Sequence, residues 1–309
     1  MRLIGSFFKM IRFPNLFFIA LTQVLFQFCI YYPLYRGYIP DTDVLHFPML
    51  VLASVFIAAA GYIINDYFDI NIDEVNKPDR MVVGKYISRR WAIAWHFMLS
   101  ISGIALTMLA LPLRQWYLVL ANIFCVALLW FYSTTFKRKL LIGNIVISIL
   151  TSWTILIIFF SKVSVTDALL PQHHSQPKLF RFAFLYAGFA FIISLIREAI
   201  KDIEDMRGDA RYGCRTMPIV WGINTTKMYT TVWLIILIVI LSIVQVYVLQ
   251  FRWWWAVGYC ILVIIVPLID MLVKLFRANS TKQYHRLSNE AKVVMLTGIL
   301  SMLFFYFYL

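Results

Sequence analysis

The sequence predicts an all-α, polytopic membrane protein with about nine transmembrane helices. Its composition is the first observation behind this fold class. The chain has 309 residues, of which 62% are hydrophobic and only 14% are charged, and its mean hydropathy is +0.79. Soluble globular proteins do not have this composition, whereas integral membrane proteins do.

Long uncharged runs are the second observation. A transmembrane helix needs about 20 predominantly apolar residues, and nine runs of 15–24 uncharged residues approach or reach this length. The sixth, eighth and ninth runs are the shortest, so their polar flanks must extend the helices. The nine runs are residues 13–35, 44–65, 91–113, 115–136, 140–161, 182–196, 228–251, 253–269 and 293–309.

The distribution of charge between these runs is the third observation, and it predicts the orientation. If the N-terminus is cytoplasmic, the cytoplasmic segments hold 22 of the 28 Lys and Arg residues and 12 of the 15 Asp and Glu residues. Such a bias is typical of cytoplasmic loops. We therefore expect a multi-pass protein of the cell inner membrane with a cytoplasmic N-terminus. No soluble domain fits between the spans, so residues 1–309 are predicted to form a single transmembrane domain.

Two acidic motifs of identical spacing occur where apolar runs end. Both have the pattern D-x-x-D-x-x-x-D, which comprises Asp66, Asp69 and Asp73 in the first motif and Asp202, Asp205 and Asp209 in the second. On a helix, positions i, i+3 and i+7 fall within an arc of about 60°. Three carboxylates on one face repel each other unless a cation or a basic partner neutralises them.

Divalent metal binding explains this spacing better than surface ion pairing does. Magnesium prefers oxygen ligands and combines one or two carboxylates with phosphate oxygens of a substrate. A single acidic triplet could simply pair with nearby Lys and Arg. Two identical triplets beside basic loops at the same membrane face favour a functional site, because clusters of ionisable residues at a membrane are costly. The expected arrangement is two acidic faces that hold Mg²⁺ around a diphosphate.

Basic residues in the same predicted layer would stabilise the charge on a departing diphosphate. Each of them has an alternative role in setting the topology. Tyr132 could donate a hydrogen bond to a phosphate oxygen. Five aromatic residues are candidates to shield a carbocation from water, namely Tyr62, Tyr67, Phe68, Phe131 and Trp153. The basic residues of this layer are Arg80, Lys85, Lys137, Arg138, Arg197, Lys201, Arg211 and Arg215.

The net charge of +13 does not indicate nucleic-acid binding, because the basic residues lie in short loops between apolar runs, where lipid headgroups explain them. The four cysteines are far apart in the sequence and contain no C-x-x-C pair. Neither a zinc site nor a disulfide framework is therefore indicated. No protein partner is predicted.

The motifs together resemble the UbiA superfamily of intramembrane prenyltransferases. The resemblance covers residues 61–222. It includes the first acidic motif with Asn65, then Asn76-Lys77-Pro78-Asp79-Arg80, the segment from Tyr132 to Arg138, the second motif preceded by Arg197-Glu198, and Thr216-Met-Pro-Ile-Val-Trp-Gly222. It implies nine helices around a central cavity, covered by a cytosolic cap, and Mg²⁺-dependent transfer of a polyprenyl group from its diphosphate.

The resemblance also implies roles for individual residues. Asp66, Asp69, Asp202, Lys137 and Tyr132 would take part in catalysis. The metal ligands would be Asp66, Asp69, Asp73, Asp202, Asp205 and Asp209. The residues expected to bind the diphosphate are Asn65, Arg80, Lys137, Arg138, Lys201 and Arg211.

The acceptor is the least determined part of this interpretation. The run from Arg197 to Asp209 looks most like the branch of the superfamily that transfers a geranylgeranyl group to the hydroxyl of a prenylglyceryl phosphate. After the first motif, however, Arg80-Met-Val-Val-Gly84 lacks the proline and serine that the family often has. An aromatic acceptor, as in quinone, tocopherol or haem O biosynthesis, is the alternative. A cation-coupled transporter is a more remote one, since transporters place acidic residues near the bilayer midplane.

Overall fold

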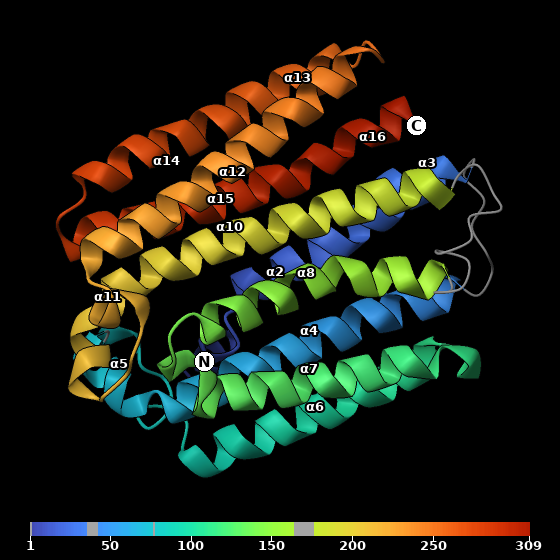
Figure 1. Cartoon of the computed structure of the whole chain (residues 1–309). Coiled ribbons are helices and arrows are strands. Elements are labelled where there is room, and N and C mark those ends of the chain that lie inside the picture. The colour runs from blue at the N-terminus through green and yellow to red at the C-terminus, as the bar shows by residue number, and fades with distance from the viewer. Residues whose placement is uncertain (1, 36–42, 77, 164–175) are drawn as a thin grey trace.

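The computed structural model describes residues 2–35, 43–76, 78–163 and 176–309, and the side chains of residues 2, 3, 80 and 176 also lie outside the description. The fold is a bundle of long, roughly parallel helices (Figure 1). Nine helical segments of the described chain are long and apolar enough to cross a bilayer. They are Phe13–Leu34, Asp43–Phe68, Arg89–Ala110, Leu113–Thr134, Ile142–Lys162, Pro177–Arg211, Ile223–Leu249, Trp254–Arg277 and Thr281–Tyr308.

Three of these spans differ from the uncharged runs because charged residues continue the helices. The sixth expected run, 182–196, is the centre of α10 (Gln176–Arg211). The ninth, 293–309, is preceded by three polar turns of α15 (Thr281–Leu300), which begins at a capping box of Ser280 and Gln283. The eighth span comprises α13 (Trp254–Tyr259), the π-helical segment η5 (Cys260–Ile265) and α14 (Val266–Arg277).

Six spans surround a central space and the other three lie outside them. The inner helices are α2 (Phe13–Leu25), α4 (Asp43–Phe68), α7 (Trp116–Thr134), α8 (Ile142–Lys162), α10 and α15. Of the outer helices, α6 (Arg89–Ala110) packs on α4, and α12 (Ile223–Leu249) packs on α10. The contact between α6 and α4 is close, since a Cβ atom on Gly103 would meet Cγ1 of Ile57 at 2.8 Å. Small residues allow this approach where no hydrophobic effect drives helices together.

Short helices cluster at the end of the bundle where the N-terminus lies (Figure 1). The C-terminus lies at the opposite end. The short helices are α1 (Arg2–Met10), α5 (Ile70–Asn76), η2 (Pro78–Arg80), η4 (Phe136–Arg138) and α11 (Met217–Val220). We refer to residues 69–76 and 78–88 as the cap. Val82 and Val83 of the cap are buried against Met10 and Ile11 of the N-terminal segment, so α1 supports the cap from the side.

The remaining short helices complete the connections. The segments η1 (Phe26–Tyr31) and α3 (Tyr32–Leu34) extend the first span, η3 (Leu113–Gln115) precedes α7, and η6 (Ser301–Phe304) and α16 (Phe305–Tyr308) extend the last span.

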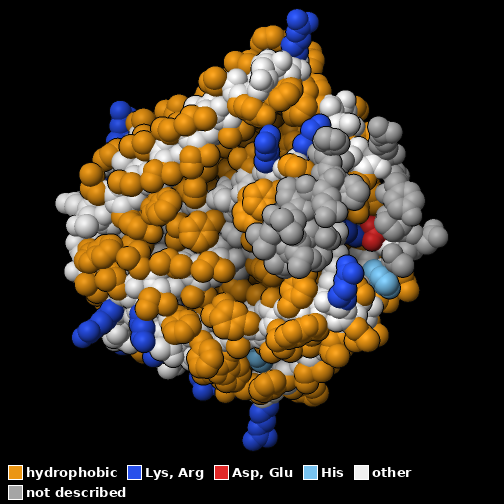
Figure 2. Space-filling view, turned by 45° about the vertical axis from the view of Figure 1, so that its right-hand side comes forward, with side chains coloured by type: hydrophobic (Ala, Val, Ile, Leu, Met, Phe, Trp, Pro, Cys, Tyr) orange, Lys and Arg blue, Asp and Glu red, His pale blue; other side chains and the backbone are white. Residues whose placement is uncertain are grey.

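Hydrophobic side chains cover most of the face in Figure 2, with only scattered Lys and Arg between them. This surface fits a lipid environment. The predicted all-α bundle with nine spans is confirmed.

Candidate active site

The two acidic motifs lie on different helices at the same end of the bundle. Asp66 is in the last turn of α4, Asp69 is the residue between α4 and α5, and Asp73 is in α5. The backbone N–H of Asp69 donates to the carbonyl of Asn65 (3.0 Å), and that of Asp73 donates to the carbonyl of Asp69 (2.8 Å). Helical register therefore continues through the break between the helices. The second motif lies wholly within α10.

Both motifs face one polar chamber of about 310 Å³, and all six aspartates and Asn65 line it. The cap covers this chamber with Ile70, Ile72 and residues 81–83. Asn76 ties α5 to α10: its Nδ2 donates to the carbonyl of Asp205 (3.0 Å), and its Oδ1 accepts from the N–H of Gly208 (2.9 Å). This link fixes the distance between the two acidic motifs.

The other predicted residues divide into three groups. Tyr132, Lys137 and Lys201 line the polar chamber. Arg138 and Arg211 are exposed and do not belong to its wall. The side chain of Arg80 lies outside the described residues.

Basic and amide groups hold three of the aspartates. Lys137 Nζ forms an ion pair with Oδ1 of Asp69, and both side chains are largely buried. In the same motif, Nη2 of Arg12 pairs with Oδ1 of Asp66 at 2.7 Å. Asn144 Nδ2 donates to Oδ2 of Asp202 at 3.0 Å. These partners offset the mutual repulsion of the carboxylates.

Arg12 was not predicted as a site residue, because the sequence shows it only as a basic residue ahead of the first span. It has a left-handed backbone conformation (φ 52°, ψ 53°) between α1 and α2, which non-glycine residues adopt rarely and mostly at functional positions. Burial acts to lower the pKa of the Arg12 guanidinium, but the charge of Asp66, its hydrogen bond and the nearby Tyr62 and Asp73 together raise the pKa above its ordinary value. Arg12 therefore stays charged.

A further buried acidic residue, Glu198, lies beside the two acidic motifs. Glu198 accepts from Nη1 of Arg197 at 2.5 Å and is 3.7 Å from Nζ of Lys201. Its side chain is 9% exposed. Asn144 lies inside the predicted run 140–161, and Glu198 lies two residues after the run 182–196. A search for polar residues in or next to predicted spans could therefore have found both.

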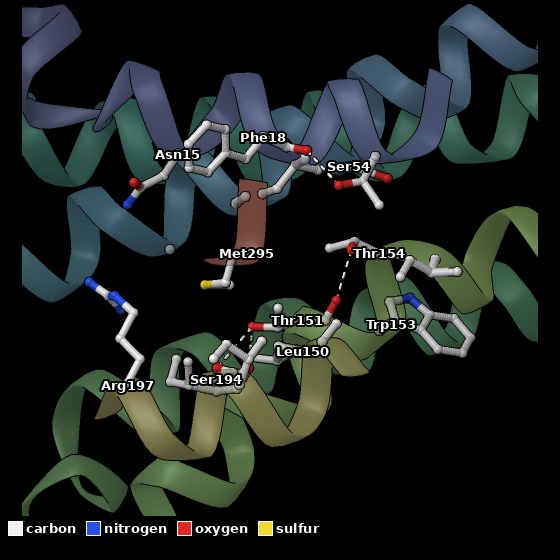
Figure 3. Close-up of a pocket in the computed structure, with 18 of the residues that line it drawn as sticks. Asn15, Phe18, Ser54, Leu150, Thr151, Trp153, Thr154, Ser194, Arg197 and Met295 are labelled. Atoms are coloured by element: carbon white, nitrogen blue, oxygen red, sulfur yellow. Dashed lines mark hydrogen bonds between the residues drawn. The ribbon is translucent and has the colours of Figure 1, made fainter. Parts of the chain in front are cut away.

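An apolar cavity of about 240 Å³ continues the chamber toward the middle of the bundle (Figure 3). Eight residues line both spaces, so the chamber and the cavity meet at a neck formed by Arg12, Asn15, Asn65, Tyr132, Arg197, Glu198, Lys201 and Lys292. Among the aromatic candidates, Tyr62 and Trp153 line the apolar cavity, whereas Tyr67, Phe68 and Phe131 are absent from both walls.

The donor atoms of the chamber suit magnesium. Its wall offers carboxylate oxygens and amide groups, which hard divalent cations prefer. Among the described residues, no three His, Cys, Asp or Glu side chains form a ready-made metal site. Mg²⁺ typically binds few protein carboxylates and completes its coordination with water and phosphate oxygens.

Comparison with known proteins identifies the family. The sequence matches the UbiA prenyltransferase family over residues 16–307. The chain belongs to this family. It is 30% identical to the digeranylgeranylglyceryl phosphate synthase of Methanosphaera stadtmanae over 257 residues, which cover 82% of this chain and 86% of the relative. It is 29% identical to the digeranylgeranylglyceryl phosphate synthase of Methanobrevibacter smithii, and the match covers 82% of this chain and 84% of the relative.

Solved structures of UbiA family members share the fold. A digeranylgeranylglyceryl phosphate synthase structure superposes with a TM-score of 0.61 at 21% identity, covering 98% of this chain and 99% of the other. A UbiA homologue from Archaeoglobus fulgidus bound to DMAPP and Mg²⁺ has a TM-score of 0.57 at 15% identity, covering 96% and 99%. The predicted resemblance is thus confirmed, and this UbiA family member is a prenyltransferase rather than a transporter.

Proposed function

We propose that the protein transfers a geranylgeranyl group from its diphosphate to the hydroxyl of a prenylglyceryl phosphate, with Mg²⁺ as cofactor. The single observation that carries this proposal is the division of the site into two connected spaces. The polar chamber is lined by both acidic motifs, and the apolar cavity begins at the same neck. A molecule with a charged head and a hydrocarbon tail matches that division.

The dimensions of the cavity agree with a long prenyl chain. Its wall on α10 extends from Lys201 to Tyr186, and a rise of 1.5 Å per helical residue makes this stretch about 22 Å long. On α4 the wall extends from Asn65 to Ser54, which corresponds to about 16 Å. Such a space shields the chain and the allylic carbon from water, which would otherwise capture the cation.

The aspartates of the two motifs, with Asn65, would hold Mg²⁺ at the diphosphate. Bound magnesium would stabilise the charge that develops on the departing oxygens. Lys137 and Lys201 line the same chamber and would bind these oxygens directly. Tyr132, at the neck, would donate a hydrogen bond to them. Arg80 would also bind the diphosphate. The exposure of Arg138 and Arg211 instead favours a role in setting the membrane topology.

The transfer breaks one bond and forms another. The bond between the allylic carbon and the diphosphate oxygen breaks, and its electron pair leaves with the diphosphate. The acceptor oxygen then forms an ether bond to that carbon, and its proton passes to an oxygen of the departing diphosphate. Arg12 and Lys137, which pair with Asp66 and Asp69, would turn to the substrate once metal neutralises these carboxylates.

The choice of acceptor is supported by the relatives and by the charge of the site. Relatives of about 30% identity over most of the chain are named digeranylgeranylglyceryl phosphate synthases. The neck contains Arg197 and Lys292 in addition to Lys201, and an acceptor with its own phosphate would use their charge. We also propose that residues 1–309 act as one unit and that the capped end faces the cytoplasm.

Mass spectrometry of the products tests the proposal. Detergent-solubilised protein would receive geranylgeranyl diphosphate and Mg²⁺, with geranylgeranylglyceryl phosphate and 4-hydroxybenzoate as competing acceptors. We expect an ether product of the glyceryl phosphate, loss of turnover in EDTA, and recovery when Mg²⁺ is restored. Prenylated 4-hydroxybenzoate as the sole product would instead identify an aromatic prenyltransferase.

A further inference from the structure

A group of polar residues at the neck is not needed for the diphosphate. Asn15 lies on α2, Arg197 on α10 and Lys292 on α15, and all three line both the polar chamber and the apolar cavity. They come from three helices other than those that carry Tyr132 and Lys137, which lie on α7 and η4. The neck therefore has cationic residues besides those assigned to the diphosphate.

Arg197 carries the strongest sign that an anion binds there. Its Nη1 donates to Glu198, but its Nε is buried and has no hydrogen-bond partner among the described residues. A buried donor without an acceptor is costly. Guanidinium groups are well suited to phosphate, because they donate parallel hydrogen bonds to two oxygens.

The directions of the side chains agree with such a role. In Figure 3, Asn15 and Arg197 point toward one another across one end of the cavity, and Met295 lies between the helices that carry them. On α15, the residues that line the two spaces change from polar to apolar along the helix. His285, Asn289 and Lys292 are followed by Met295 and Ile299. Lys292 is therefore the last charged residue before the apolar cavity.

We propose that Asn15, Arg197 and Lys292 form a subsite for the phosphate of the acceptor. This inference rests on the proposed function and extends it to specificity. A prenylglyceryl phosphate carries its free hydroxyl between the phosphate and the ether-linked chain. A phosphate held at the neck places that hydroxyl beside the allylic carbon, while the chain remains in apolar surroundings. Asn15, Arg197 and Lys292 would thus bind the phosphate of the acceptor, while Lys137 and Lys201 bind the diphosphate of the donor.

Steady-state kinetics on the full-length protein test the subsite. The informative variants are Lys292→Gln and Asn15→Asp, the second of which preserves side-chain shape and adds a negative charge near the bound phosphate. Lys282→Gln is the matched control, since Lys282 is an exposed lysine on the same helix and lines neither space. The measured quantities are the KM for geranylgeranylglyceryl phosphate and the KM for geranylgeranyl diphosphate.

Loss of one charge-assisted hydrogen bond should raise the KM for the acceptor about tenfold or more. The KM for the donor should change less than about twofold. Geranylgeranylglycerol, which lacks the phosphate, should show the same KM with the unmodified protein and with both variants. The control should behave like the unmodified protein in every assay.

Three outcomes would overturn the subsite, and they show whether the proposed function fails with it. If the unmodified protein uses the phosphorylated acceptor but neither variant raises its KM, the subsite is wrong while the proposed function remains. An equal rise in the KM of donor and acceptor has the same meaning, because it places these residues at the diphosphate. If the unmodified protein does not alkylate the phosphorylated acceptor at all, both proposals fail together.

Discussion

At the scale of single residues, the site depends on carboxylates whose negative charge is partly offset by basic and amide partners. Asp66 and Asp69 each have a cationic partner, Arg12 and Lys137. The second motif has Asn144 on Asp202 and Lys201 in the same wall. These partners offset the mutual repulsion of the carboxylates, and metal and substrate would replace them.

Asp205→Asn tests the role of the second motif. The substitution keeps the shape of the side chain but removes a negative charge from the chamber, so metal and diphosphate should be stabilised less in the transition state. We expect diphosphate release to fall about 100-fold or more, with a higher Mg²⁺ concentration needed for half-maximal rate. The apparent melting temperature in detergent should change little.

Asp270→Asn is the control for this experiment. Asp270 pairs with Lys274 on α14, and its side chain is 54% exposed and distant from the chamber wall. Its replacement should leave both the rate and the Mg²⁺ dependence unchanged. Normal turnover in Asp205→Asn would remove this residue from the proposed metal site.

Residue-level prediction from the sequence succeeded where local periodicity decides the result. Helical spacing alone placed three carboxylates of each motif on one face, and all six line the chamber. Spacing could not tell which of two adjacent residues lines the chamber, because that depends on tertiary structure. Lys137 enters the chamber and Arg138 does not, although they are adjacent in the sequence. Arg12 and Lys292 are far from both motifs in sequence, so only the packed bundle could associate them with the site.

At the scale of elements, the important contact is the link between α5 and α10. Gly208 is required here, because a Cβ atom at this position would lie 2.5 Å from the side chain of Asn76. The same Asn76 accepts from the N–H of Gly208 and donates to the carbonyl of Asp205. One short contact thus sets how the first acidic motif faces the second.

Gly208→Ala should therefore disturb both stability and activity. The added methyl group displaces Asn76, and overpacking of this kind costs about 1–3 kcal/mol. We expect a lower apparent melting temperature and slower diphosphate release. Gly188→Ala, in the same helix but with no atom within 4 Å of the new Cβ, should be neutral or stabilising, since alanine favours helices by about 0.5–1 kcal/mol.

A double-mutant cycle distinguishes the link from a general effect on α10. In an Asn76→Ala background the new methyl group has room, so Gly208→Ala should add little to the effect of Asn76→Ala alone. Full additivity of the two substitutions would show that Asn76 and Gly208 act independently, contrary to the contact described here.

At the scale of the whole molecule, the count of spans and the position of the termini agree. An odd number of crossings separates the two ends of the chain, and Figure 1 places the N-terminus and the C-terminus at opposite ends of the bundle. Hydropathy was sufficient to predict these crossings, because a lipid environment demands long helices. It was not sufficient to predict where α10 and α15 begin and end, since their charged turns border the polar chamber instead of lipid.

The orientation of the bundle in the membrane can be measured directly. The capped end carries most of the basic loops, which predicts that it faces the cytoplasm. Lys139→Cys, at an exposed position after η4, and Arg114→Cys, at an exposed position in η3, report on the two ends of the bundle. The four native cysteines are buried, so an impermeant maleimide should label them weakly.

With sealed vesicles of cytoplasmic-side-out orientation, the maleimide should label Lys139→Cys readily and Arg114→Cys only after detergent is added. Right-side-out vesicles should give the reverse pattern. The unmodified chain measures the background from the native cysteines. Labelling of Arg114→Cys from the cytoplasmic side would invert the predicted topology and place the acidic chamber at the outer face, where the basic loops would contradict the charge bias of membrane proteins.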